Sequence, residues 1–424
     1  MSEDSILPFE LSEFKETPLG QLPEEWEVVL LGEVARVLYG RAKPNVHGIV
    51  PVIGSGGIYA WTQAPLVRFP TLVIGRKGTA GRVWLLEQPC WPSDTTFYLE
   101  WKHPVEIAFL FWFLSLNPLS GEHAKTTLPS LQRHDLENLL IPLPPLPEQR
   151  AIAHVLRTVQ RAKEATERVI QATRELKKSL MRHLFTYGPV PLTEADRVPL
   201  KETEISPIPE HWQAVKLGDV VAKVKGIQRG PWGGSIKKDI FVKEGYKVYE
   251  QKNVIQKNFQ IGTYYIDEGK FKELQEFEVK SGDILITAAG TLGKLAIVPA
   301  GIEKGVINQA LLRIRLDEEI ICKLFFTYFF TKIVEEGKMS AYSHGATLKN
   351  LSSVKVLKTI QILLLPLPEQ REIARILQAV DQKIQAAERR KQALEELFKT
   401  LLSHLMTGKI RVNHLIQENE EEIS

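Results

Sequence analysis

Cysteine is rare in this chain, which limits the chemistry that the sequence supports. Only two of the 424 residues are cysteine, Cys90 and Cys322, and they lie far apart. A disulfide framework and a cysteine zinc site within the chain are therefore excluded. Because so few thiols suit a reducing compartment, we expect a cytoplasmic protein.

Targeting and membrane signals are also missing. The start, Met-Ser-Glu-Asp-Ser, has neither the basic nor the apolar segment of a secretory signal. The most apolar run, residues 320–330, is too short to cross a bilayer and is interrupted by Lys323. We expect no membrane association.

The chain has little excess charge. Its 54 Lys and Arg residues nearly balance 51 Asp and Glu residues, which gives a net charge of +3. Any basic surface must therefore be local, balanced by acidic segments such as residues 418–422. With 44% hydrophobic and 25% charged residues, the composition is typical of a globular protein, and the length allows two or three domains.

Familiar catalytic motifs are not found either. The glycine-rich segments 75–81 and 290–294 each contain a cation, but neither fits the Gly-x-x-x-x-Gly-Lys-Ser/Thr phosphate loop, so turn glycines are the favoured interpretation. His183 and His404 occupy equivalent positions in two long helical runs. They could bind a metal, but seam-edge histidines are the favoured interpretation. These residues therefore indicate no catalytic site, and we predict no metal site.

What the sequence does contain is an internal repeat. Leu-Pro-Glu-Gln-Arg occurs at residues 146–150 and again at 367–371, and Glu369 stands 221 residues after Glu148. A long run without internal Pro or Gly follows each copy and ends at Gly188 or Gly408. Proline before the run, Glu in its first turn and glycine after it predict a capped helix in each copy.

Both runs carry a heptad seam. Residues 152, 159, 166, 173 and 180 repeat at intervals of seven, each followed three positions later by a second expected seam residue, among them Val169 and Leu176. The second run repeats the pattern from Ile373 to Leu401 and has a wider apolar face. Since a helix of roughly 60 Å cannot bury such a seam alone, we predict an antiparallel coiled-coil pair. Two independent helices packed on their own domains are the alternative.

A second motif opens each half of the chain. Pro23-Glu24-Glu25-Trp26 returns as Pro209-Glu210-His211-Trp212, with a spacing of 186 between the two tryptophans. Short strand-like runs separated by glycine turns follow in both halves. Five prolines between Gly188 and Pro209 predict an extended linker.

These observations predict an α+β tandem duplication with pseudo-two-fold symmetry, in which a pair of long antiparallel coiled-coil helices separates two β-rich globular units. The predicted segments are an N-terminal arm at 1–20, a first globular unit at 21–147, a central spacer helix at 148–188, a linker at 189–206, a second globular unit at 207–367, a C-terminal spacer helix at 368–408 and an acidic tail at 409–424.

The order of these motifs resembles the specificity (S) subunit of type I DNA restriction–modification enzymes, over essentially the whole chain. The two Leu-Pro-Glu-Gln-Arg helices carry most of the resemblance. Further matches are the two tryptophan openings and the segments Gly54-Ser55-Gly56-Gly57, Ile74-Gly75-Arg76-Lys77-Gly78, Asp94-Thr95-Thr96-Phe97-Tyr98 and Ser281-Gly282-Asp283-Ile284-Leu285.

The resemblance implies a non-catalytic subunit whose globular units are target-recognition domains, each reading one half of a split, asymmetric DNA site. The helix pair would set the spacing between the half-sites and dock methyltransferase subunits. The other expected partners are double-stranded DNA and the restriction subunits. No cofactor is expected in this chain; S-adenosylmethionine, ATP and magnesium would belong to the partner subunits.

Candidate DNA contacts are cations near glycine turns and amides that could read bases, because Arg, Lys, Asn and Gln supply most phosphate and base contacts. In the first unit we predict Arg41, Lys43, Arg76, Lys77, Arg82 and Arg133. In the second unit we predict Gln228, Arg229, Lys237, Lys238, Lys252, Asn253 and Lys294. Arg76 and Lys77 fall in a family motif and could serve the fold instead.

Two other functions are compatible with the sequence. One is a coiled-coil adaptor whose globular units bind proteins without DNA specificity. The other is an enzyme with an unrecognised site, such as a fused nuclease. Steep salt dependence of DNA binding would argue against the adaptor, and DNA cleavage or methylation by the purified chain would favour the enzyme.

Overall fold

The computed structural model describes residues 13–116, 119, 130–231, 236, 238–344, 350–351 and 353–412. Contacts divide the chain into two compact units. Unit 1 comprises Met1–Val169 and Ala387–Ser424, and unit 2 comprises Ile170–Ala386. Each unit therefore contains one globular domain and part of each long helix.

The globular part of unit 1 consists of short strands and three helices. The strands are β1 (Phe14–Thr17), β2 (Gly20–Pro23), β3 (Glu27–Leu30), β4 (Ala35–Tyr39), β5 (Val50–Gly54), β6 (Gly57–Thr62), β7 (Thr71–Gly75), β8 (Val83–Leu86), β9 (Trp91–Pro92), β10 (Thr96–Trp101) and β11 (Leu140–Leu143). The helices are α1 (Leu31–Val34), α2 (Ile107–Leu116) and α3 (Arg133–Glu137).

Unit 2 has more elements. Its strands are β12 (Leu200–Lys201), β13 (Ile208–Pro209), β14 (Gln213–Lys216), β15 (Ile227–Arg229), β16 (Tyr246–Tyr249), β17 (Tyr265–Ile266), β18 (Ile284–Thr287), β19 (Leu295–Ile297), β20 (Gly305–Ile307), β21 (Leu311–Ile314), β22 (Ser343–His344), β23 (Asn350–Leu351) and β24 (Gln361–Leu364). Its helices are α5 (Gln251–Ile255), α6 (Glu268–Glu273), α7 (Lys323–Glu335) and α8 (Val354–Leu357).

The two globular domains share one topology. The four-stranded antiparallel sheet has the order β4-β10-β7-β8 in unit 1 and β15-β21-β18-β19 in unit 2. Each unit also has a three-stranded sheet, β6-β5-β9 or β17-β16-β20, in which one strand pair is parallel. The pairs β11-β3 and β14-β24 correspond as well. This match confirms the predicted duplication and the α+β class.

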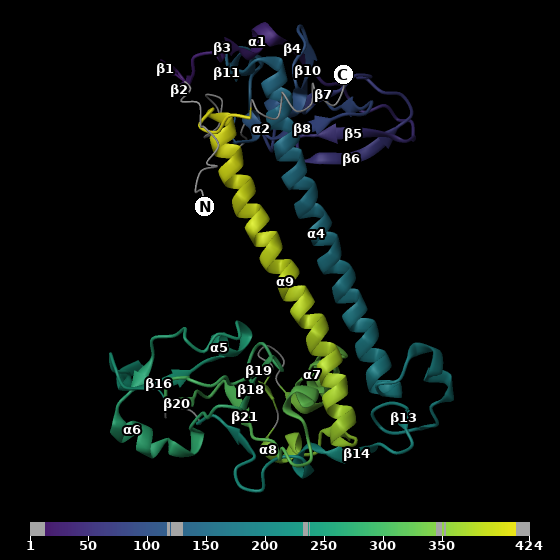
Figure 1. The fold of residues 1–424 in the computed structure, drawn as a ribbon, viewed down its shortest axis with the longest axis vertical. Helices are drawn as coiled ribbons and strands as arrows, with labels where there is room; N and C mark the ends of the chain where they lie inside the picture. Colours follow the sequence, from purple (N-terminus) through teal and green to yellow (C-terminus); the bar gives the residue numbers. More distant parts are fainter. Residues whose placement is uncertain are drawn as a thin grey trace, which may run out of the picture. The chain divides into compact units, whose positions relative to one another are not determined.

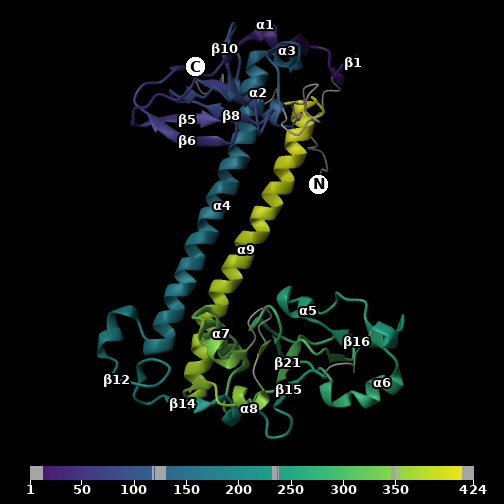
Figure 2. The same cartoon turned by 180° about the vertical axis from the view of Figure 1, so that it is seen from behind.

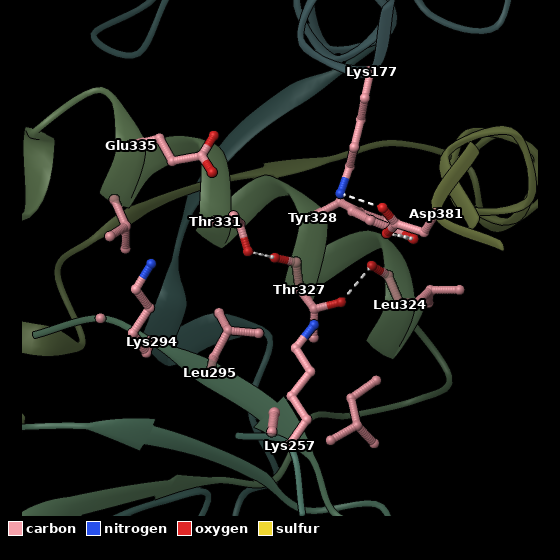
Figure 3. A pocket seen from close by; sticks show the side chains of 14 residues that line it. Lys177, Lys257, Lys294, Leu295, Leu324, Thr327, Tyr328, Thr331, Glu335 and Asp381 are labelled. Atoms are coloured by element: carbon pink, nitrogen blue, oxygen red, sulfur yellow. Dashed lines mark hydrogen bonds and ion pairs between the residues drawn. The ribbon is translucent and has the colours of Figure 1, made fainter. Parts of the chain in front are cut away.

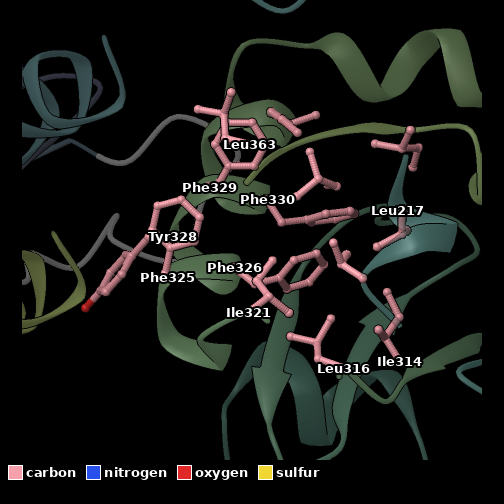
Figure 4. Packing of buried hydrophobic residues seen from close by; sticks show 14 of the residues in the cluster. Leu217, Ile314, Leu316, Ile321, Phe325, Phe326, Tyr328, Phe329, Phe330 and Leu363 are labelled. Carbon is pink, nitrogen blue, oxygen red and sulfur yellow. The ribbon is translucent and has the colours of Figure 1, made fainter. Parts of the chain in front are cut away.

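The apolar helix of each unit lies in the core. α2 is apolar on nearly every side, and α7 buries seven of its 13 residues, as expected of helices that other side chains surround. In unit 2, four phenylalanines of α7 pack among aliphatic side chains of the sheet and of the flanking segments (Figure 4). These are Phe325, Phe326, Phe329 and Phe330.

Two long helices, α4 (Leu146–Tyr187) and α9 (Leu367–Met406), contribute to both units. In unit 1 the start of α4 lies beside the end of α9, where Glu167 pairs with Lys391 at 2.9 Å. In unit 2 the end of α4 lies beside the start of α9, where Lys177 pairs with Asp381 at 2.6 Å. The helices are therefore antiparallel in each unit (Figures 1 and 2), as the heptads predict.

The seam differs from the prediction in one respect. The positions spaced by seven are covered, with Ile152 and Thr166 buried. The second seam position comes four residues later, at Leu156 and Ile170, whereas Val169 and Leu176 are 45% and 52% exposed. The assignment of Val169 and Leu176 to the seam is therefore wrong. After Ile152 and Thr166 both the third and the fourth following positions are apolar, so the pattern alone did not select between them.

The Leu-Pro-Glu-Gln-Arg motif joins each helix to its globular domain. The indole of Trp26 donates to the carboxylate of Glu148 at 3.0 Å, and Trp212 donates to Glu369 at 2.9 Å. The tryptophan opening and the proline-rich helix start therefore meet in each unit, in a buried contact in unit 1 and a partly buried one in unit 2. Neither repeat by itself indicated that they meet.

The glutamine of the motif fixes the apolar helix. Gln149 accepts the N–H of Glu106 at the start of α2 at 3.0 Å and donates to the carbonyl of Pro144 at 2.8 Å. Gln370 does the same in unit 2, accepting the N–H of Cys322 at 2.7 Å. In each unit this amide accepts an N–H that the start of the apolar helix leaves unpaired, and it donates to a carbonyl just before the long helix.

We predict that Gln149→Leu lowers the free energy of unfolding of unit 1 by about 2–4 kcal/mol. The change leaves the N–H of Glu106 and the carbonyl of Pro144 without their hydrogen-bond partner. Hydrogen exchange of unit 1 amides is the measurement. The matched control is Arg150→Ala at the next, exposed position, which should change stability by less than about 0.5 kcal/mol. Equal effects of the two changes would contradict this role.

The predicted arm and linker contain regular structure. Residues 14–23 form the hairpin β1-β2, in which Lys15 donates to the carbonyl of Glu24 at 2.5 Å. In the predicted linker, residues 192–197 form a 3-10 helix and β12 pairs with β13. The irregular arm and extended linker are therefore wrong for these residues, because both hairpins reuse the duplicated topology. Residues 1–12 lie outside the described range.

Candidate nucleic-acid interface

A glycine turn ends in an exposed cation in both units. In unit 1 the N–H of Gly75 donates to the carbonyl of Arg82 at 2.8 Å, and Gly81 donates back to Gly75 at 2.9 Å. In unit 2 Thr287 and Lys294 form the same pair at 2.8 Å, and Gly293 donates to Thr287 at 3.0 Å. The equal spacing in the sequence therefore reflects one turn built twice.

The turn needs glycine at its crowded corner. Gly81 has φ +81, and a Cβ there would lie 2.3 Å from the Leu119 carbonyl oxygen. This backbone presents Arg82 to solvent, with its guanidinium 4.2 Å from the ring centre of Trp84. Lys294 is exposed at the equivalent place. Both predicted cations are thus exposed at the end of the same kind of turn.

Arg76, by contrast, serves the fold of its own turn. It is half-buried, donates to the carbonyl of Asp94 at 2.9 Å, and lies over the rings of Tyr39 and Phe97. Lys77 beside it is exposed, and its backbone bridges to Ser130.

The remaining candidate side chains of unit 1 differ in their exposure to solvent and in their contacts. Arg41 is exposed, while its carbonyl accepts the indole N–H of Trp91 at 3.0 Å. Lys43 is half-buried. Arg133 pairs with Glu137 one turn later on α3 at 2.7 Å and keeps 45% of its side chain exposed.

In unit 2, Gln228 and Arg229 lie on β15 at the edge of the four-stranded sheet. Arg229 donates to the carbonyl of Leu351 at 2.7 Å, and burial lowers the pKa of its guanidinium. Gln228 is half-buried. This strand therefore offers only partly accessible groups.

The unit-2 segment between β15 and β17 contains the other candidates. Lys237 lies outside the described residues, and Lys238 begins a 3-10 helix at Lys238–Ile240. Lys252 is 41% exposed and pairs with Glu250 at 2.7 Å. Asn253 is fully buried and bonds to the following loop, so its amide supports that loop instead of facing solvent.

A cavity of about 330 Å³ adjoins Lys294 in unit 2 (Figure 3). One side is formed by Lys177 and Asp381, which also accepts the hydroxyl of Tyr328 at 2.8 Å. Lys257, which we did not predict, lines the same cavity. The only signal for it in the sequence was the Lys-, Gln- and Asn-rich stretch 226–262.

Neither a metal-binding cluster nor a membrane-spanning helix is found in the part of the chain that the structure describes. No three His, Cys, Asp or Glu side chains there form a group that could hold a metal ion. His183 lies in unit 2 with its ring nitrogen 2.7 Å from the Val190 carbonyl oxygen, and His404 lies in unit 1. No helix within those residues has the length and apolar character of a membrane span.

Comparison with known proteins identifies the family. The profile of the type I restriction modification DNA specificity domain matches the chain twice, at residues 23–174 and 209–396. The chain belongs to this family. These specificity subunits recognise the DNA sequence for a type I restriction–modification complex, and that is the function of this chain.

Individual relatives agree with this assignment. The MjaVIII specificity subunit of Methanocaldococcus jannaschii is 28% identical over 426 residues, which cover 95% of this chain and 97% of the relative. The EcoBI specificity subunit of Escherichia coli is 25% identical over 272 residues, covering 61% and 55%. The S subunit structure from M. genitalium shares the fold of this specificity subunit with a TM-score of 0.60 at 17% identity, over 90% of this chain and 96% of that one.

Proposed function

We propose that each unit of this specificity subunit reads one half of a split DNA site. The observation that supports this most directly is the repeated glycine turn, which presents Arg82 in unit 1 and Lys294 in unit 2 from the same position of the same topology. Two related units suit two half-sites, as in dimeric repressors. Because the units differ in their exposed residues, the two half-sites should differ and the whole site should be asymmetric.

The long helices supply the spacing in this proposal. α4 has 42 residues and α9 has 40, and neither is broken where the two units meet in the sequence. A paired helix resists bending better than a flexible linker, so the gap between half-sites should be fixed. The charged, exposed faces of the helices would dock methyltransferase subunits.

The chemistry would reside in the partners. We propose that this chain contributes no catalytic group, that methyltransferase subunits bind S-adenosylmethionine, and that restriction subunits use ATP and magnesium. The complex would work in the cytoplasm, where DNA is accessible. Another solved structure of this fold, 18% identical with a TM-score of 0.52, is described as concerning complex assembly of the type I restriction–modification system.

Salt dependence separates this proposal from a protein-binding adaptor. We predict that the affinity of the chain for its target duplex falls steeply with salt, by about 0.9 in the log–log slope for each phosphate contact. With six or more contacts, raising salt from 50 to 200 mM should weaken binding about 10³-fold or more. Fluorescence anisotropy with a labelled duplex is the measurement. A flat salt response would favour the adaptor, and cleavage or methylation by the chain alone would favour an enzyme.

A further inference from the structure

Unit 2 contains a loop that has no counterpart among the described residues of unit 1. In unit 1 the paired strands β5 and β6 are joined by Ser55 and Gly56 alone. In unit 2 the corresponding strands β16 and β17 are separated by residues 250–264, which form α5 and then the segment Gln256–Gly262. We call this segment the α5 loop. Its sequence is Gln-Lys-Asn-Phe-Gln-Ile-Gly.

Buried polar side chains hold the α5 loop in one conformation. Asn253, with no exposed surface, donates to the carbonyls of Asn258 and Ile261 at 3.1 and 2.8 Å. Lys247 is 1% exposed, donates to the carbonyl of Gln260 at 3.0 Å and pairs with Glu303. Burying an amide and an ammonium group is unfavourable unless every such bond forms. These bonds therefore fix the path of the loop backbone.

An aromatic residue anchors the same loop. Phe259 is 4% exposed, and its ring centre lies 5.8 Å from that of Tyr249. The residues on either side of it, Asn258 and Gln260, are exposed. The loop is therefore packed on one side and presents polar side chains on the other.

The exposed side carries the residue types that read bases. Gln256, Asn258 and Gln260 are all exposed. The side-chain oxygen of Asn258 accepts the N–H of Gln260 at 3.0 Å, whereas the side-chain amides of Gln256 and Gln260 bond to no protein group within the described residues. An exposed glutamine on a rigid loop can place its donor and acceptor on the edge of adenine in the major groove.

Lys257 adds a strained backbone to this pattern. Its φ is +50, a region that lysine rarely adopts, and among the described residues Lys225 is the only other non-glycine residue with positive φ. Such strain costs free energy and is typical of functional positions. The side chain of Lys257 lines the cavity that Lys294 also lines (Figure 3).

Charge in that cavity favours an anion near the two lysines. Asp381 is paired with Lys177 at 2.6 Å, so its charge is already balanced. Glu335 is the remaining carboxylate of the lining, opposed by Lys257 and Lys294. Lys294 ends the glycine turn that corresponds to the turn of Arg82 in unit 1. Because Lys257 and Lys294 line one cavity, the α5 loop adjoins the surface that we assign to DNA.

We propose that the α5 loop reads bases in the half-site of unit 2. Gln256 and Gln260 contact base edges, while Lys257 and Lys294 hold a backbone phosphate that fixes the loop in register. This inference rests on the proposed recognition of one half-site by each unit. It assigns sequence choice in unit 2 to a segment that unit 1 lacks.

The base contacts are tested with Gln256→Ala combined with Gln260→Ala in the full chain, assembled with its methyltransferase partner. The ratio of affinities for the target duplex and for duplexes changed at single base pairs should fall about 5- to 150-fold in the half-site of unit 2 only. Binding to a random duplex and the midpoint of thermal unfolding should not change. An unchanged ratio, or a loss in both half-sites, would overturn the proposal.

The phosphate contact is tested with Lys257→Gly, since glycine tolerates the positive φ. This variant should unfold at an equal or higher temperature, yet the slope of log affinity against log salt should become shallower by about 0.9. Lys225→Gly is the matched control, because it removes the same charge from the same backbone conformation away from the cavity. Equal slopes for the two variants would overturn the role of Lys257.

These experiments separate the inference from the function on which it rests. If the unaltered chain does not prefer one duplex over others, or if its affinity for DNA does not depend on salt, the proposed function itself fails. If the unaltered chain binds its site and both loop variants behave like it, only the assignment of the α5 loop is wrong.

Discussion

Exchanging residues 21–147 of this specificity subunit for the corresponding unit of another family member should change one half of the recognised site and leave the other half unchanged. The expectation follows from the separate hydrophobic cores of the two units, each closed by its own tryptophan–glutamate contact. Each mismatched base pair costs about 1–3 kcal/mol. A half-site with two or three wrong pairs should therefore lose at least about 30-fold in affinity.

Binding to a panel of duplexes in which one half-site at a time is replaced is the measurement. The control is the reciprocal exchange of residues 207–367, which should alter the opposite half. A change in both halves from either exchange would contradict modular recognition.

Glu148→Ala should destabilise unit 1 by about 3 kcal/mol. Glu148 is 2% exposed and accepts the indole N–H of Trp26 at 3.0 Å. It also pairs with Arg411 at 2.7 Å, and the Arg411 side chain is only 15% exposed. Removing one partner of a buried pair costs about 3–5 kcal/mol, but Arg411 keeps a second ion pair with the mostly exposed Glu25 at 2.6 Å. Partial hydration of Arg411 places the expected value at the lower end.

The matched control is Glu369→Ala in unit 2. Glu369 has 27% of its side chain exposed, and its basic neighbour is His211, which is 55% exposed. Its loss should cost unit 2 less than the loss of Glu148 costs unit 1. Hydrogen exchange resolved by unit measures both, and a double-mutant cycle with Arg411→Ala isolates the pair. Independent effects of Glu148 and Arg411 would contradict the coupling.

Repeats made much of the fold predictable. The two Leu-Pro-Glu-Gln-Arg segments, the two tryptophan openings and the matched glycine turns predicted the duplication, because identical local sequences at matched spacing build identical local structure. The helix ends at Gly188 and Gly408, both with positive φ, follow from the same reasoning. Contacts between distant segments were not predictable. Nothing in a heptad indicates that Glu148 meets Trp26.

The candidate interface was harder to predict, because an exposed cation and a structural cation look alike in a sequence. Arg82 and Arg76 flank the same glycines, yet one faces solvent and the other lies over Tyr39 and Phe97. Asn253 and Gln260 are both amide side chains of one segment. Only their burial in the structure shows that Asn253 supports the loop and that Gln260 faces solvent. The individual DNA contacts remain predictions.

We propose that this one chain carries two dissimilar DNA-reading units at a fixed separation. Mapping methylated adenines across the host genome, with and without this chain, distinguishes this arrangement from its alternatives. We predict that one motif disappears when the chain is removed, and that this motif has two different specific parts around a gap of constant length. An unaltered methylation map, or a lost motif that is continuous or has a variable gap, would contradict it.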